Sequence, residues 1–185
     1  LRHRNRRSEI RWHCPICDDM TQLHLRPTHP GEIDAVIAIE SHPEVSKWVG
    51  QWSAPDHFAA IHNDAIDHLV VLDEQGVVIG YGIIADKFNI DDNVELLRLA
   101  LSRRGEGIGH ALVETLLAHA FSIGNTHRVW RDVVAKNFAA AAVYVRAGFQ
   151  REGTMRQAYN DETGRSDMYL MSILRPEWED RSKSD

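Results

Sequence analysis

The segment Leu96–Gly109, LLRLALSRRGEGIG, constrains the fold of this chain more than any other. An apolar strand pattern leads into a glycine-rich turn, Arg104–Gly109, and an amphipathic helix pattern over residues 107–123 begins at once. Such a turn presents backbone N–H groups at a helix N-terminus, where the helix dipole favours an anion such as a pyrophosphate. Glycine suits the turn because it tolerates positive φ and lets an anion approach the backbone.

A second informative segment, Asn137–Phe149 with the sequence NFAAAAVYVRAGF, follows further along the chain. Asn137 stands where a helix N-cap belongs, because its side chain can accept a hydrogen bond from the first turn. The helix pattern continues through Ala147 and ends at Gly148. The two segments together predict a strand–helix–strand–helix unit.

Taken in order, these segments resemble the GNAT superfamily, the acetyl-CoA-dependent N-acetyltransferases. That family carries Gln/Arg-x-x-Gly-x-Gly/Ala after its fourth strand, then an Asn at the start of a later helix, a Tyr in that helix and a Gly-Phe after it. The matching residues here are Arg104–Gly109, Asn137, Tyr144 and Gly148–Phe149. The resemblance covers residues 21–174. It implies an α/β (α+β) domain of three layers, with a mixed, mostly antiparallel sheet of about seven strands and helices on both faces.

Hydrophobic periodicity predicts a compatible order of elements. We expect strands over residues 21–25, 69–72, 77–84, 94–101, 129–134, 149–153 and 166–173. We expect helices over residues 30–39, 43–49, 55–66, 107–123 and 137–147. The turn Asp73–Gly76 predicts a hairpin, and the polar segment Asn160–Gly164 separates the last two strands.

Length and composition predict one folded domain with two extensions. The 185 residues are 43% hydrophobic, and no apolar run approaches the length that spans a bilayer. We expect a leader over residues 1–19 that is disordered or a non-native extension, an acetyltransferase domain over 20–176, and a charged, frayed tail over 177–185. The expected location is the cytoplasm.

The leader contains the only two cysteines, Cys14 and Cys17, a spacing that resembles half of a zinc knuckle. Zinc usually takes four ligands, and the nearby histidines fit no standard spacing, so we expect no metal and no redox pair here. The net charge of −6 argues against nucleic-acid binding. An acidic body either steers cationic amines towards the protein or is a plain solvated surface.

The family resemblance implies which residues hold acetyl-CoA. The glycine turn would bind the pyrophosphate, the backbone of the preceding strand would contact the acetyl and pantetheine portion, and Asn137 would reach the pantetheine arm. The implied cofactor-binding set is Leu99, Ala100, Leu101, Arg103, Arg104, Gly105, Glu106, Gly107, Ile108, Gly109, His110, Asn137 and Ala140. The alternative role of Asn137 is that of a plain helix cap, and one side chain can fill both roles.

Acyl transfer to an amine also needs a base and an acid, because an alkyl ammonium has a pKa of about 10.4. By resemblance, Glu95 is the base and Tyr144 protonates the leaving thiolate. Period-two geometry places Glu95 on one strand face with Leu97, Leu99 and Leu101, where an apolar surrounding would raise its pKa. The alternatives are a surface Glu95 paired with Arg98, and a Tyr144 that serves only as a core aromatic residue.

The sequence therefore predicts an enzyme that transfers acetyl from acetyl-CoA directly to a primary amine, on a small molecule or a protein N-terminus. The alternative is a non-catalytic acyl-CoA-binding sensor or scaffold. The glycine spacing fits neither a dinucleotide fold nor a P-loop. Substrate choice would lie in the early helices and in a 155–166 loop; His42, His57 and His62 are expected at the surface, or else in contact with substrate. Dimers are frequent in the family, so a homodimer is the assembly we consider.

Overall fold

The computed structural model describes residues 23–103, 105, 107–161 and 164–181. Its strands are β1 (His24–Pro27), β2 (Asp67–Leu72), β3 (Val78–Ala85), β4 (Asn93–Leu101), β5 (Arg128–Val134), β6 (Gln150–Asp161) and β7 (Gly164–Leu174). Its helices are η1 (Pro30–Glu32), α1 (Ile33–Glu40), α2 (Pro43–Ser46), α3 (Ala54–Ile61), α4 (Ile108–Ser122), α5 (Phe138–Arg146) and α6 (Arg175–Arg181). The predictions for the leader, Cys14, Cys17, Arg104 and Glu106 lie outside the described residues.

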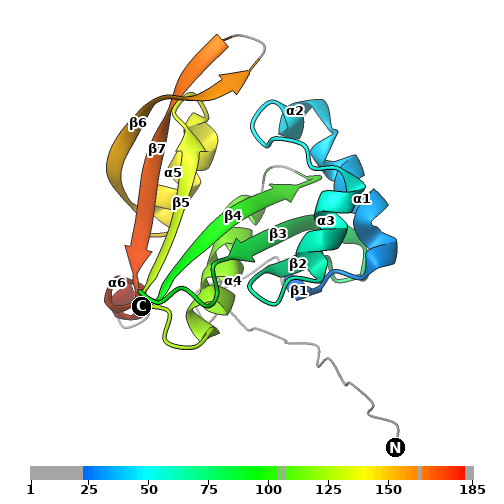
Figure 1. Ribbon diagram of the computed structural model, residues 1–185, viewed down its shortest axis with the longest axis horizontal. Coiled ribbons are helices and arrows are strands. Elements are labelled where there is room, and N and C mark those ends of the chain that lie inside the picture. Colours follow the sequence, from blue (N-terminus) through cyan, green and yellow to red (C-terminus); the bar gives the residue numbers. More distant parts are fainter. Residues whose placement is uncertain (1–22, 104, 106, 162–163, 182–185) are drawn as a thin grey trace, which may run out of the picture.

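The strands form one sheet in the order β1-β2-β3-β4-β5-β7-β6 (Figure 1). Neighbouring strands run antiparallel except β4 and β5, which are parallel. The predicted hairpin is present as β2–β3, and Asp73 Oδ1 accepts hydrogen bonds from the backbone N–H of Gln75 and of Val77 in its turn. The predicted mixed, mostly antiparallel sheet of seven strands is confirmed.

Two hydrophobic cores lie on opposite faces of the sheet. The larger core packs α4 and α5 against the sheet, with Leu112, Leu116 and Tyr144 among its buried side chains. The smaller core packs α1 and α2 against β2, β3 and β4, with Val36 and Val45 among its members. Because each face buries its own set of apolar side chains, the sheet has a helical layer on both sides, and the three-layer prediction is confirmed (Figure 1).

A β-bulge in β4 changes which side chains share a face. Ile83 pairs with Arg98 and Ile84 pairs with Leu96, so Leu97 is one extra residue in β4. Leu96 therefore packs in the larger core and Leu97 against the smaller one, and the alternation is reversed beyond this point. Glu95 shares a face with Leu97, whereas Leu99 and Leu101 lie on the opposite face; the prediction of one common face was wrong.

The pairing of β4 with β5 is short, and this opens the sheet. Only Asn93, Val94 and Glu95 pair with β5, at Arg128, Val129 and Trp130. Beyond these pairs the two strands diverge, as Figure 1 shows, while β5 stays paired with β7 along residues 128–134. The edge of β4 that follows Glu95 thus faces the gap instead of a neighbouring strand.

Two segments expected to be irregular are regular secondary structure, and the helices predicted over 43–49 and 55–66 end earlier, at Ser46 and Ile61. The predicted 155–166 loop is mostly strand, because β6 continues through an irregularity between Met155 and Tyr159 and pairs with β7 up to Asp161. Of the tail expected to fray over 177–185, residues 177–181 are instead part of α6, where Trp178 stacks on Phe121 of α4 with ring centroids 5.0 Å apart. No helix in the described part of the chain is long and apolar enough to cross a bilayer.

Candidate active site

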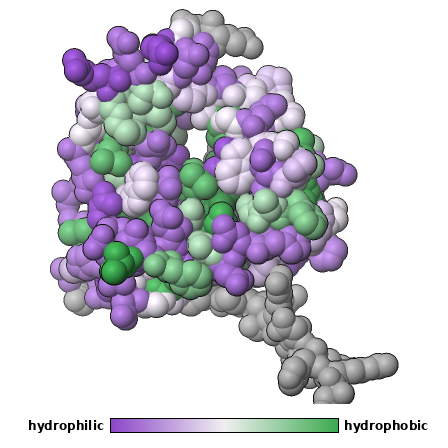
Figure 2. All heavy atoms as spheres, viewed as in Figure 1, coloured by the Kyte–Doolittle hydropathy of each residue, from purple (hydrophilic) through white to green (hydrophobic). Residues whose placement is uncertain are grey.

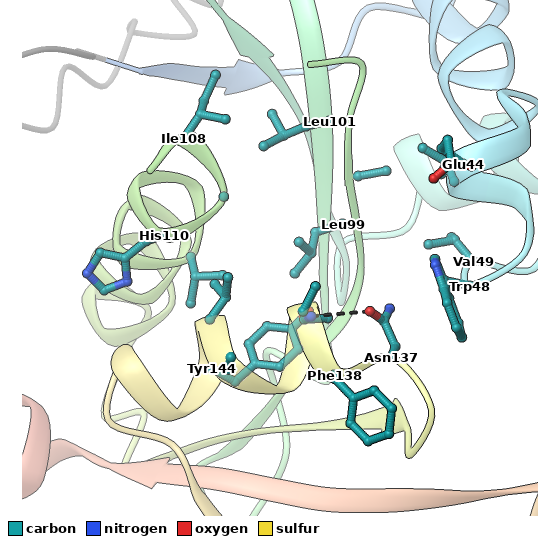
Figure 3. A pocket seen from close by; sticks show the side chains of 18 of the residues that line it. Glu44, Trp48, Val49, Leu99, Leu101, Ile108, His110, Asn137, Phe138 and Tyr144 are labelled. Atoms are coloured by element: carbon teal, nitrogen blue, oxygen red, sulfur yellow. Dashed lines mark hydrogen bonds between the residues drawn. The ribbon is translucent and has the colours of Figure 1, made fainter. Parts of the chain in front are cut away.

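A cavity of about 780 Å³ lies between β4, α4, α5 and the segment around α2. Figure 3 shows Leu99 and Leu101 of β4 facing Ile108 of α4, with Tyr144 of α5 beside them. Every described member of the predicted cofactor-binding set lines this cavity: Leu99, Ala100, Leu101, Arg103, Gly105, Gly107, Ile108, Gly109, His110, Asn137 and Ala140. The sequence motifs, far apart along the chain, thus come together around one space.

The glycine turn has the backbone that its sequence predicts. Gly105 has φ of +97° and Gly107, the N-cap of α4, has φ of +75°, a left-handed conformation that favours glycine. Among the described residues no side chain caps α4, so none of them provides an acceptor for the first N–H groups of the helix. A Cβ atom on either glycine would meet nothing within 4 Å. The turn is therefore an open cradle at a positive helix end, suited to an anion.

Asn137 is the N-cap of α5. Its Oδ1 accepts a hydrogen bond of 3.2 Å from the N–H of Ala140, drawn as the dashed line in Figure 3. The predicted helix cap is confirmed. Because the cap uses the oxygen, the amide nitrogen of Asn137 is the group that can donate to a ligand in the cavity it lines.

Tyr144 is buried at the inner wall of the cavity, 4% exposed. Its ring packs edge-on against Phe149, and the guanidinium of Arg131 lies 4.4 Å from its centroid. Burial raises the pKa of the Tyr144 hydroxyl, and the positive charge of Arg131 opposes this rise. The phenol is therefore protonated at neutral pH and able to donate a proton or a hydrogen bond.

Glu95 lies where β4 and β5 separate, as the last β4 residue that pairs with β5. It does not line the cavity, and its side chain is on the opposite face of the sheet from Leu99 and Leu101. Burial raises its pKa to about 7, with the negative charges of Asp132 and Asp86 adding to the rise and Arg131 opposing it. A carboxylate with this pKa gains and loses a proton near neutral pH, as a general base requires.

Comparison with known proteins identifies the family of this site. The profile of the Acetyltransferase (GNAT) family matches residues 32–149, more than half of the chain. The chain belongs to the GNAT acetyltransferase family. It is an acetyltransferase, and the cavity, the glycine turn and the opening between β4 and β5 lie within the matched region or against it.

Three comparisons with Vibrio cholerae proteins refine this result. A spermidine N(1)-acetyltransferase is 27% identical over 124 residues, covering 66% of this chain and 72% of the relative. The crystal structure of a spermidine N-acetyltransferase in complex with CoA and spermine superposes with a TM-score of 0.77 at 22% identity, covering 85% of this chain and 98% of that one. A dodecameric structure of spermidine N-acetyltransferase gives a TM-score of 0.73 at 23% identity, covering 87% and 98%. At these identities the two structures establish the fold.

Several residues that line the cavity of this acetyltransferase were not predicted from the sequence. Trp48 and Val49 follow α2; Lys136 precedes the N-cap of α5, and Phe138 and Arg146 are the first and last residues of that helix. These last three residues lie near Asn137 or Tyr144 in the sequence, so the helix pattern around those two residues was a usable signal. Trp48 and Val49 follow a helix of only four residues, which has no periodicity to read.

His110 and His57 have surroundings that the sequence pattern did not specify. In Figure 3 the ring of His110 points away from Leu99 and Leu101, and its Nε2 lies 3.8 Å from Glu114. Burial lowers the pKa of His110, so its ring is neutral at neutral pH. His57, expected at the surface, is fully buried, and that prediction was wrong.

Proposed function

We propose that this acetyltransferase transfers the acetyl group of acetyl-CoA to a primary amine of a small polyamine of the spermidine class. The observation that carries the proposal is the cavity, in which the glycine turn, the edge of β4 and the start of α5 surround one space. The Vibrio cholerae relatives support the acceptor class, because both are spermidine acetyltransferases.

The cavity accounts for acetyl-CoA as the acetyl donor. Its pyrophosphate fits the cradle at Gly105 and Gly107, where the backbone N–H groups and the helix dipole favour an anion. The pantetheine amides then pair with the edge of β4 beyond Glu95, which faces the gap. Asn137 donates to the pantetheine arm through its amide nitrogen while its oxygen caps α5.

The chemistry uses both faces of the sheet. A protonated amine approaches from the face of Glu95, whose carboxylate removes the proton, directly or through a water molecule. The neutral nitrogen attacks the thioester carbon in the gap between β4 and β5 and forms the C–N bond. The C–S bond then breaks, and the leaving thiolate takes the proton of the Tyr144 hydroxyl from the opposite face, which gives an N-acetylated amine and CoA.

The acidic surroundings of Glu95 favour a cationic acceptor. Asp132 and Asp86 lie near enough to raise the pKa of Glu95, so three carboxylates share this region. Figure 2 shows the surface hollowed between the part formed by α5, β6 and β7 and the part formed by α1 to α3, which opens a path to this face. A polyamine brings several positive charges to such a region, whereas a monoamine brings one.

An acetylation assay tests the proposal. The purified protein is incubated with acetyl-CoA and, in separate reactions, with spermidine, spermine, putrescine and a short peptide with a free N-terminus; released CoA thiol is followed, and products are identified by mass spectrometry. We expect acetylated polyamine and little acetylated peptide. Acetylation of the peptide alone would contradict the acceptor class, and no binding of acetyl-CoA in calorimetric titration would contradict the proposed site.

Assembly is a separate part of the proposal. A homodimer is the assembly that the sequence resemblance favours, whereas one relative of similar fold is dodecameric. We propose that the active protein is an oligomer. Light scattering coupled to size-exclusion chromatography gives its mass, and a monomer at assay concentration would contradict this part alone.

A further inference from the structure

A buried polar cluster lies on the acceptor face of the sheet and has no role in the chemistry above. We call Glu40, Trp52, His57, Tyr81 and Arg98 the Glu40 cluster. Glu40 ends α1, Trp52 precedes α3, His57 lies in α3, and Tyr81 and Arg98 come from β3 and β4. Glu40 is 1% exposed, so its carboxylate is held entirely by its protein partners.

Three hydrogen-bond donors and a histidine nitrogen surround the Glu40 carboxylate. Its Oε1 accepts hydrogen bonds from the Tyr81 hydroxyl and, at 3.1 Å, from Arg98 Nη2. Its Oε2 accepts a hydrogen bond of 3.0 Å from the backbone N–H of Trp52 and lies 3.5 Å from His57 Nε2. These donors outweigh burial and lower the pKa of Glu40 to about 2, so the group is an anion that faces the Arg98 cation.

Arg98 also borders the acceptor side. Its guanidinium stacks on Trp52, 4.7 Å from the ring centroid, and its side chain is 11% exposed. Its positive charge reaches β6 on the other side of the hollow, where it opposes the rise in the pKa of Tyr159. Because of the bulge at Leu97, Arg98 shares a face with Glu95, about 10 Å away along the strand.

An unbalanced cation at this position would work against a polycationic acceptor. A unit positive charge about 10 Å from a positive charge of the acceptor, partly shielded from solvent, weakens binding by about threefold to tenfold, and acceptor charges that lie further away contribute less. The penalty grows with the number of charges, so it would be severe for a polyamine and small for a monoamine. Glu40 removes it by placing an anion against Arg98.

We propose that Glu40 is a specificity-determining residue of the acceptor side: it neutralises Arg98 and thereby allows a polycationic amine to bind beside Glu95. It acts through Arg98 and does not touch the reacting atoms, so its effect is on acceptor binding and not on acetyl-CoA. The inference rests on the proposed function, because it concerns the charge of the acceptor that function assigns.

The test is the acceptor KM of Glu40→Gln across amines of rising charge: butylamine, putrescine, spermidine and spermine. Glutamine keeps the size of the side chain and can still accept from Tyr81, but leaves Arg98 without its anion. We expect the ratio of variant to wild-type KM to rise with acceptor charge, by about threefold to tenfold for each charge that binds within about 10 Å of Arg98, with kcat and the KM of acetyl-CoA unchanged. The double variant E40Q/R98M, neutral again, should return the ratio to near one.

A matched control separates charge from the loss of an ion pair. Glu32 forms an ion pair with Arg26, with 2.5 Å between the charged atoms, and neither residue lines the cavity. Glu32→Gln should therefore leave every KM unchanged. If Glu40→Gln fails to fold, Arg98→Met tests the opposite change of charge. It leaves the Glu40 carboxylate without its cation, so the ratio of variant to wild-type KM should fall as acceptor charge rises.

Two results would overturn the inference in distinguishable ways. If the wild type is active but the variants change KM equally for all four amines, the role of Glu40 is structural only. That result would refute the inference and leave the proposed function in place. A wild type that acetylates none of the amines would refute the proposed function and this inference with it.

Discussion

At Glu95, burial and two neighbouring carboxylates act in the same direction and raise the pKa to about 7. A base with this pKa is protonated and inactive below pH 7, so kcat/KM of the wild type should fall as the pH falls through about 7. Glu95→Gln should lower kcat/KM by about 10²–10⁴-fold and abolish this acidic limb of the pH profile, so that activity rises only as the free amine forms at high pH. The matched control is Asp132→Asn, which removes a negative charge beside Glu95, lowers its pKa and should move the limb to lower pH. If the acidic limb of the pH profile stays at the same pH in both variants, it reports the titration of a group other than Glu95.

Tyr144 makes a prediction of the opposite kind, because its hydroxyl matters while its ring must stay. Tyr144→Phe keeps the packing against Phe149 and under Arg131, and removes only the proton donor. We expect kcat to fall by about 10²-fold, with the dissociation constant of acetyl-CoA unchanged in calorimetric titration. An unchanged kcat would remove Tyr144 from proton transfer and leave it as a core aromatic residue.

Single residues were predictable where a local motif fixes them. Asn137, Tyr144 and the turn glycines were found because capping, helix spacing and positive φ are properties of a few consecutive residues. The burial of His57 was not, because it depends on Glu40 and His68, which lie far from it in the sequence. The face of Glu95 was misjudged because one extra residue in β4 is decided by its pairing with β3.

At the scale of elements, the turn before α4 allows a controlled test of the cradle. Gly107 and Gly76 have φ of +75° and +77°, and a Cβ atom on either would meet nothing within 4 Å. Gly107→Ala and Gly76→Ala should therefore cost similar stability, about 1 kcal/mol each. Only Gly107 lines the cavity, so only its variant should weaken acetyl-CoA binding, by about tenfold in calorimetric titration. Equal binding by the two variants would show that the turn is not the anion site.

The elements themselves were predicted unevenly, for a physical reason. The strands and helices of the two cores have strong apolar periodicity, and β3, β4 and α4 lie within two residues of their predicted bounds. The predicted length of β6 was too short, because its exposed sequence, QREGTMRQAYND, has little hydrophobic pattern and is held by backbone pairing with β7. The helix α6 was not predicted because its sequence is mostly charged, and the single tryptophan that stacks on α4 gives no apolar periodicity.

At the scale of the whole molecule, α6 ties the end of the described chain to the helix that begins at the glycine turn. Trp178 stacks on Phe121 of α4, and Arg181 pairs with the buried Glu114 of the same helix and donates to the carbonyl of Ala147. The helix that presents the anion cradle is thus supported from behind by a segment outside the matched family region. Removing this support should reduce stability without altering the cavity.

Trp178→Ala tests this support. Loss of the stacked ring should cost about 2 kcal/mol, which for a domain of this size lowers Tm by about 4–8 °C in a thermal unfolding scan. Because Trp178 does not line the cavity, kcat and the KM of acetyl-CoA at 25 °C should stay at wild-type values. Phe88→Ala is the control, since that aromatic ring is 73% exposed and its loss should leave Tm unchanged. If Trp178→Ala and Phe88→Ala have the same Tm, the stacking of Trp178 adds nothing to the stability of the fold. If Trp178→Ala instead lowers acetyl-CoA affinity at 25 °C, this contact shapes the cradle as well as stabilising it.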